Sequence, residues 1–102
     1  MGEEDGYIVK VAKDLEDLIP AFLSNRKKEL ENLRAALAAA DFEQLRQLGH
    51  RMRGVGNSYG FEHVSLLGKE IEEGARSRDQ TSLAGHIAAY GEYLSKVQVA
   101  YE

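Results

Sequence analysis

Apolar residues recur along this chain at steps of three and four, the spacing that places side chains on one face of a helix. Series of this kind run through residues 15–37, 45–59 and 64–75. The most regular series comes last and comprises Leu83, Ile87, Tyr90, Leu94, Val97 and Tyr101. The pattern therefore predicts a chain of helices, of which the last continues to Tyr101.

Turn and cap signals mark where these helices begin and end. The single proline, Pro20, suits the first turn of a helix and disrupts a helix interior. A short helix over residues 14–19 followed by a long one from Pro20 is therefore favoured over one helix kinked at Pro20. Asp41 is suited to cap the next helix, and Gly60 is suited to end it.

Short connections make successive helices antiparallel neighbours. The sequence thus predicts an all-α fold, an up-and-down antiparallel four-helix bundle over residues 14–102. Residues 1–13 are expected to form a short N-terminal arm or helix. The alternation of Tyr7, Val9 and Val11 with their neighbours favours an extended arm.

The composition agrees with one domain of this kind. A chain of 102 residues, 43% of them hydrophobic, is long enough to bury a core without disulfides. It contains no cysteine, which excludes disulfides, thiolate nucleophiles and cysteine-bound zinc. Its net charge of -4 argues against nucleic-acid or anionic-membrane binding, and no apolar run approaches the ~20 residues of a membrane span. The acidic start differs from a secretory signal, so we expect a cytoplasmic protein. We also expect a monomer, although no sequence feature decides the oligomeric state.

One histidine lies on the polar side of its predicted helix. On a wheel of 3.6 residues per turn, His50 points away from the apolar series of residues 45–59. Four residues share its side of the helix: Arg46, Arg53, Gly54 and Asn57. His50 is therefore predicted to expose its imidazole to solvent at mid-helix, where a neutral ring nitrogen can act as a nucleophile.

The same helix contains three glycines, although each costs about 1 kcal/mol relative to alanine in a helix interior. They are Gly49, Gly54 and Gly56. Gly54 follows His50 by one turn and is expected to leave bare surface against which a partner can press. The charged residues from Gln44 to Gly60 are all basic: Arg46, Arg51 and Arg53. A flat, positively charged face of this kind favours an incoming anion carried by an acidic partner. His63 and His86 lack such surroundings and are interpreted as solvated polar residues.

The string Gly49-His50-Arg51-Met52-Arg53-Gly54, followed by Gly60, resembles the signature of the histidine-containing phosphotransfer (HPt) domain family. That signature is a histidine, a variable residue, a leucine-like residue, a lysine or arginine and a glycine, with a further glycine six residues on. The resemblance extends over about residues 14–101. Met52 departs from it conservatively, whereas Arg53 keeps the charge of the usual lysine but changes the geometry of phosphate contact.

The resemblance implies a role for each matching residue. His50 would accept and donate a phosphoryl group, Arg53 would support the phosphoryl oxygens, and Gly54 would give the partner close access. The implied docking surface comprises Arg46, Gly54, Asn57 and Gly60. No metal ligand is implied.

The implied partners are the receiver domain of a response regulator, a histidine kinase, or both. The chain would need no cofactor of its own, because the partner receiver domain would supply Mg²⁺. It lacks the Gly-x-x-x-x-Gly-Lys-Ser/Thr loop that holds nucleotide phosphates, so we expect a phosphoryl carrier without its own ATP site. The sequence does not define the direction of phosphate flow.

The residues also admit three other interpretations. A four-helix adaptor that binds a partner without chemistry would use the same glycines and arginines. A helical metalloprotein would use His50, His63 or His86, but none of them has another histidine three or four residues away. A hydrolase is disfavoured because the sequence gives no support for a Ser-His-Asp order or for a cleft with paired carboxylates.

Overall fold

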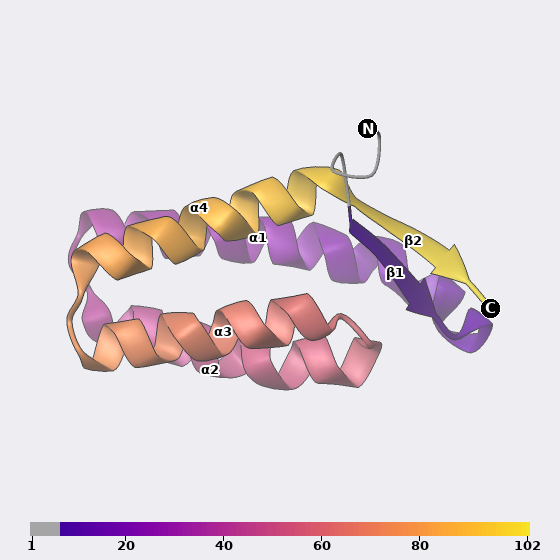
Figure 1. Cartoon of the computed structure of the whole chain (residues 1–102), viewed down its shortest axis with the longest axis horizontal. Coiled ribbons are helices and arrows are strands. Elements are labelled where there is room, and N and C mark those ends of the chain that lie inside the picture. The colour runs from indigo at the N-terminus through magenta and orange to yellow at the C-terminus, as the bar shows by residue number, and fades with distance from the viewer. Residues whose placement is uncertain (1–6) are drawn as a thin grey trace.

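The computed structural model of the protein describes residues 7–102. Four helices form the body of the molecule, α1 (Ile19–Ala38), α2 (Phe42–Tyr59), α3 (Glu62–Arg76) and α4 (Gln80–Lys96). A 3-10 helix (Lys13–Leu18) precedes α1. Two short strands, which pair with each other, lie before and after the helices in the sequence: β1 (Tyr7–Val11) and β2 (Val97–Tyr101). In Figure 1, α1 and α4 form one layer and α2 and α3 form the other. The predicted four-helix bundle is therefore confirmed. Residues 1–6 of the predicted arm lie outside the described residues.

The helix boundaries follow the caps seen in the sequence. Pro20 lies in the first turn of α1, directly after the 3-10 helix. The Asp41 side chain accepts a hydrogen bond from the backbone N of Gln44 at 3.1 Å and so begins α2. Gly60 ends α2 in the left-handed conformation, with φ of 83°, which glycine adopts without a steric penalty. Asp79 caps α4 in the same way as Asp41 caps α2.

The core consists of the predicted apolar series, turned inward from all four helices. The side chains that are wholly inaccessible to solvent include Leu33, Leu45, Met52, Ile71 and Leu83. Each such side chain stabilises the fold by roughly 1.5–3 kcal/mol relative to an exposed one. Among residues 7–102, no helix has both the length and the apolar character that crossing a bilayer requires.

The prediction that the last helix continues to Tyr101 is wrong. α4 ends at Lys96, and β2 pairs in parallel with β1 in a register that runs from Tyr7–Val97 to Val11–Tyr101. Val97, Val99 and Tyr101 are β-branched or aromatic and alternate with other residues, so they suit a strand as well as a helical stripe. The helical spacing of Val97 and Tyr101 concealed this second pattern, and β1 supplies the backbone partner that decides between the two.

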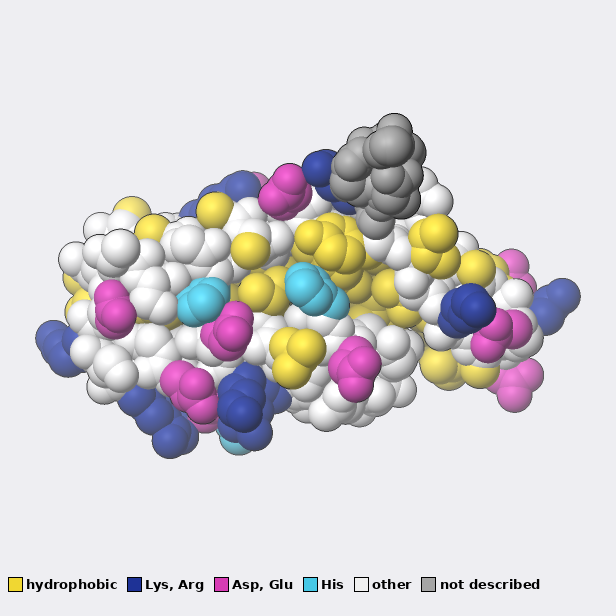
Figure 2. Space-filling view, in the orientation of Figure 1, with side chains coloured by type: hydrophobic (Ala, Val, Ile, Leu, Met, Phe, Trp, Pro, Cys, Tyr) yellow, Lys and Arg dark blue, Asp and Glu magenta, His cyan; other side chains and the backbone are white. Residues whose placement is uncertain are grey.

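The strand pair packs against the bundle through aromatic rings. The Tyr7 ring lies 5.2 Å from the His63 ring and 4.9 Å from the Tyr93 ring, centroid to centroid. Figure 2 shows hydrophobic side chains gathered in a hollow between the two helical layers on this face. β1 and the beginning of α3 line a pocket there. His63 therefore packs among rings, which corrects its interpretation as a solvated polar residue.

Candidate functional site

His50 lies in the middle of α2 with its side chain 68% exposed. The opposite face of α2 is anchored in the core by Leu45, Leu48 and Met52, all of which are buried. This anchoring fixes the rotation of the helix, so the imidazole has to face outward. The exposure predicted from the helical wheel is confirmed.

A buried carboxylate from the neighbouring helix holds the imidazole. Nδ1 of His50 lies 3.2 Å from Oε2 of Glu72 in α3, and the Glu72 side chain is only 3% exposed. No function was predicted for Glu72 from the sequence. One feature of the sequence could have identified it. Glu72 follows Gly68 by one helical turn, and so lies on the edge of α3 that carries small residues and faces α2.

This contact determines which ring nitrogen is free to react. A hydrogen bond from Arg53 holds the pKa of the Glu72 carboxyl below its usual value of 4.5, and the hydrogen bond with His50 acts in the same direction. Glu72 is therefore ionised at neutral pH and can only accept hydrogen bonds. Nδ1 of His50 must then be the donor, which leaves the lone pair of the neutral ring on Nε2.

Two arginines complete the group around Glu72. Nη1 of Arg53 donates to Oε1 of Glu72 at 2.8 Å, and Nη2 of Arg76 donates to Oε2 at 3.1 Å. Both side chains are largely exposed and carry further N–H donors. The structure thus brings Arg53 into contact with the same carboxylate as His50. Arg76 was missed because it lies on α3, outside the motif around His50.

Arg46, another cation predicted for this face, has a different partner. Its guanidinium binds the Glu43 carboxylate through two hydrogen bonds, of 3.1 and 2.7 Å. Glu43 lies one residue before the basic segment that begins at Gln44, so the predicted face did not include this acid. The predicted face is therefore less positive than expected, because Glu43 and Glu72 offset part of the charge of Arg46, Arg53 and Arg76.

The glycines of α2 serve different purposes. A Cβ atom placed on Gly54 would have no atom within 4 Å, so the bare surface predicted there is present. Gly49 and Gly56 are instead buried against α3, a role that the sequence did not predict. Asn57 is exposed on the same helix as Gly54. Gly60 lies ten positions after His50, about 15 Å along the helix axis, and its left-handed conformation accounts for the glycine there.

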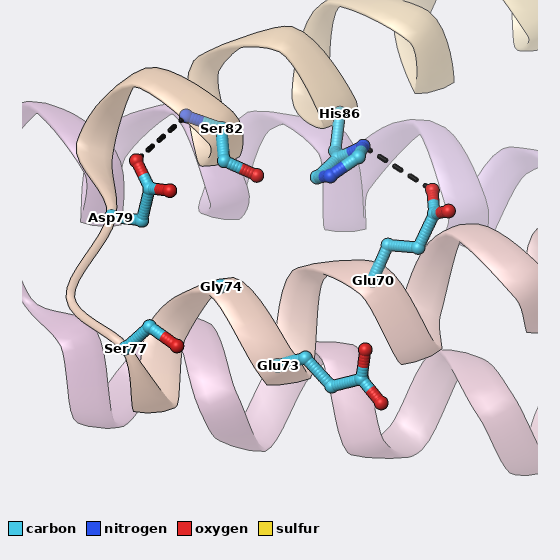
Figure 3. A pocket seen from close by; sticks show the side chains of 7 residues that line it. All are labelled: Glu70, Glu73, Gly74, Ser77, Asp79, Ser82 and His86. Atoms are coloured by element: carbon cyan, nitrogen blue, oxygen red, sulfur yellow. Dashed lines mark hydrogen bonds and ion pairs between the residues drawn. The ribbon is translucent and has the colours of Figure 1, made fainter.

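The remaining histidine, His86, lies in a polar pocket between α3 and α4. Figure 3 shows His86 directed toward Glu70, and their Nδ1 and Oε1 atoms are 3.3 Å apart. Glu73, Ser77 and Asp79 also line this pocket. Across residues 7–102, no group of three or more histidine and carboxylate side chains is placed to hold a metal ion.

The fold and the site together define a class of protein: a four-helix bundle that presents an exposed histidine on the surface of one helix. A family model described as the Hpt domain matches residues 17–100. The chain belongs to the Hpt domain family. No curated protein and no solved structure matches the chain significantly. At the level of the family, Hpt domains carry out histidine phosphotransfer in two-component phosphorelays and interact with receiver domains and histidine kinases.

Proposed function

We propose that this chain is a phosphoryl carrier in which Nε2 of His50 accepts a phosphoryl group and passes it to or from a receiver-domain aspartate. The observation that carries the proposal is the exposed imidazole whose Nδ1 contacts the buried carboxylate of Glu72. This arrangement holds the ring in one tautomer and leaves the nucleophilic nitrogen open to solvent and to a docked partner.

The transfer step follows from this geometry. The lone pair of Nε2 attacks the phosphorus of an aspartyl phosphate on a receiver domain. The new N–P bond forms as the P–O bond to the aspartate breaks, and the aspartate carboxylate leaves. With ATP bound to a histidine kinase, the leaving group is ADP. The proton on Nδ1 stays in its hydrogen bond to Glu72, which stabilises the positive charge that the ring acquires.

The surroundings of His50 supply alignment and charge neutralisation, which are the main requirements of phosphoryl transfer. Arg53 and Arg76 offer N–H donors to the phosphoryl oxygens. Gly54 lets the partner's backbone approach the helix, and Arg46 and Asn57 lie on the surface that it would cover. The partner receiver domain would contribute the Mg²⁺ ion that its own phosphate requires.

The proposal is tested by mixing the protein with a receiver domain that carries radioactive aspartyl phosphate. The label should move to this chain in a bond that is labile in acid and stable in base. A His50→Gln protein should stay unlabelled, whereas a His86→Gln protein, which changes a histidine outside the site, should take up label like the wild type.

Two results would overturn the proposal. One is labelling of the His50→Gln protein at the wild-type rate. The other is a wild-type protein that binds receiver domains but takes no label from any receiver or kinase of the source organism. That second result is the behaviour of a four-helix adaptor without chemistry.

A further inference from the structure

α2 and α3 meet along a line of buried glycines, Gly49 and Gly56 on α2 and Gly68 on α3, which we call the glycine seam. A Cβ atom on Gly49 would lie 2.7 Å from the backbone N of Glu72 and 2.7 Å from the backbone O of Gly68. A Cβ atom on Gly56 would lie 2.6 Å from the backbone N of Ser65. The two helices thus touch through their backbones.

The seam cannot absorb a methyl group from either side. A Cβ atom on Gly68 would lie 2.6 Å from Cβ of Met52, 2.7 Å from the backbone O of Gly49 and 2.8 Å from the backbone N of Arg53. Almost all of these atoms belong to helix backbones, which cannot rotate away as a side chain can. An alanine in the seam therefore has to push the two helices apart.

The half of the seam around Gly49 and Gly68 also carries the site. Glu72 rests on Gly49 with its backbone N and Cα, and His50 is the next residue after Gly49. Arg53, whose backbone N borders Gly68, is the other α2 partner of the Glu72 carboxylate. A hydroxyl from α3 adds to this contact, because Ser65 Oγ donates to the backbone O of Arg53 at 2.8 Å.

We propose that Gly49 and Gly68 are positioning residues of the phosphotransfer site. They bring α3 close enough for the buried carboxylate of Glu72 to reach Nδ1 of His50 and Nη1 of Arg53 together. The inference rests on the proposed function of His50. Each of these glycines lowers the stability of its own helix relative to alanine. This loss is offset because the glycines fix the distance between the two helices. A separation of about 1 Å is enough to misplace a reacting group and slow a reaction by on the order of a hundredfold.

Alanine at either end of the seam tests the proposal. Gly68→Ala should slow the transfer of label onto His50 by roughly tenfold to a hundredfold. It should also shift the imidazole ¹⁵N resonances of His50 away from the form that carries its proton on Nδ1. Gly56→Ala is the matched control, because it strains the same helix pair two turns away from His50. It should lower stability comparably in urea denaturation, yet keep the ¹⁵N pattern and a transfer rate within about threefold of the wild type.

A second variant keeps the test decisive if Gly68→Ala does not fold. Glu72→Asp shortens the reach of the carboxylate by one methylene and leaves the seam intact. It should reproduce both the ¹⁵N shift and the slower transfer.

The proposal is overturned if Gly68→Ala or Glu72→Asp keeps the wild-type rate and ¹⁵N pattern. It is also overturned if Gly56→Ala slows transfer as much as Gly68→Ala, since the effect then follows stability alone. A wild-type protein that takes no label overturns the proposed function instead, and the ¹⁵N pattern still reports whether the seam sets the tautomer.

Discussion

Each layer of the bundle buries one glutamate, and the two glutamates differ in their surroundings. Glu29 of α1 is 8% exposed and accepts a hydrogen bond from the Tyr90 hydroxyl at 2.9 Å, with Nε of Arg26 at 3.1 Å. Burial raises the pKa of the Glu29 carboxyl above its usual value. The hydrogen bond from Arg53 lowers the pKa of the Glu72 carboxyl in the other layer. Glu29 links α1 to α4 inside the bundle, whereas Glu72 is buried directly beneath an exposed ring.

The packing between helices also differs between the two layers. In the layer of α1 and α4, a Cβ atom on Gly91 would meet the side chains of Arg34, at 3.0 Å, and Leu30, at 3.5 Å. In the layer of α2 and α3, the seam glycines meet backbone. Side chains can move aside and backbones cannot. The layer of α1 and α4 therefore tolerates adjustment, while the layer that bears His50 has a fixed separation between its helices.

The largest expected effects come from the core that both layers share. Leu48→Ala in α2 and Leu94→Ala in α4 should each cost about 2 to 5 kcal/mol of unfolding free energy, measured by urea denaturation. Leu66→Ala, at an exposed leucine of α3, is the control and should change it by less than about 0.5 kcal/mol. A loss below about 0.5 kcal/mol at Leu94 would mean that the two layers do not share one core.

The two glutamates should give opposite pH dependence. A lowered carboxyl pKa adds stability that is present above the usual value of 4.5 and lost as the pH falls through the lowered pKa. Glu72→Gln should therefore cost about 1 to 3 kcal/mol at pH 7 and progressively less below pH 4.5.

A raised pKa works in the other direction, since its contribution is present below 4.5 and lost as the pH rises through the raised pKa. Glu29→Gln should thus gain stability relative to the wild type as the pH rises from 4.5 through the raised pKa. If the stabilities of the two variants relative to the wild type changed with pH in the same direction, the two glutamates would not differ as expected.

The exposed glycines sharpen the contrast in function. Gly54→Leu should fold and yet slow phosphotransfer from a receiver domain by roughly tenfold or more, because the new side chain blocks docking beside His50. Gly85 of α4 also has no atom within 4 Å of an added Cβ, so Gly85→Leu makes the same change in the other layer. That variant should transfer at the wild-type rate. Equal rates for both variants would show that the surface around Gly54 is not covered by the partner.

The smallest expected effects are gains in stability. Gly54→Ala and Gly85→Ala replace exposed helical glycines that face open space. Each should raise the unfolding free energy by about 0.5 to 1 kcal/mol, because alanine loses less conformational entropy in a helix. Thermal denaturation of the two variants measures the gain. A loss of stability at Gly54 would indicate a packing role for the bare surface.

Much of the bundle was predictable because helical periodicity and caps are local signals. The series through Leu45 and Met52 fixed the rotation of α2 and therefore the exposure of His50. Glu72 was not predictable as its partner, because that contact depends on how α3 is rotated against α2. The close packing of Gly49 against α3 and the strand at Val97 were not predictable for the same reason, since each depends on a segment distant in sequence.

The parallel strand pair joins residues that are far apart along the chain, since Tyr7 pairs with a residue 90 positions later. Closing a loop of that length in a disordered chain costs about 4 kcal/mol of entropy, whereas a formed bundle already holds the two segments together. The ladder should therefore assemble after the helices and open before them. Backbone amides of Val9 and Val99 should accordingly exchange with deuterium faster than those of Leu45 and Ile71. Slower exchange in the strands would mean that the strand pair forms before the helices and directs their packing, rather than forming after them.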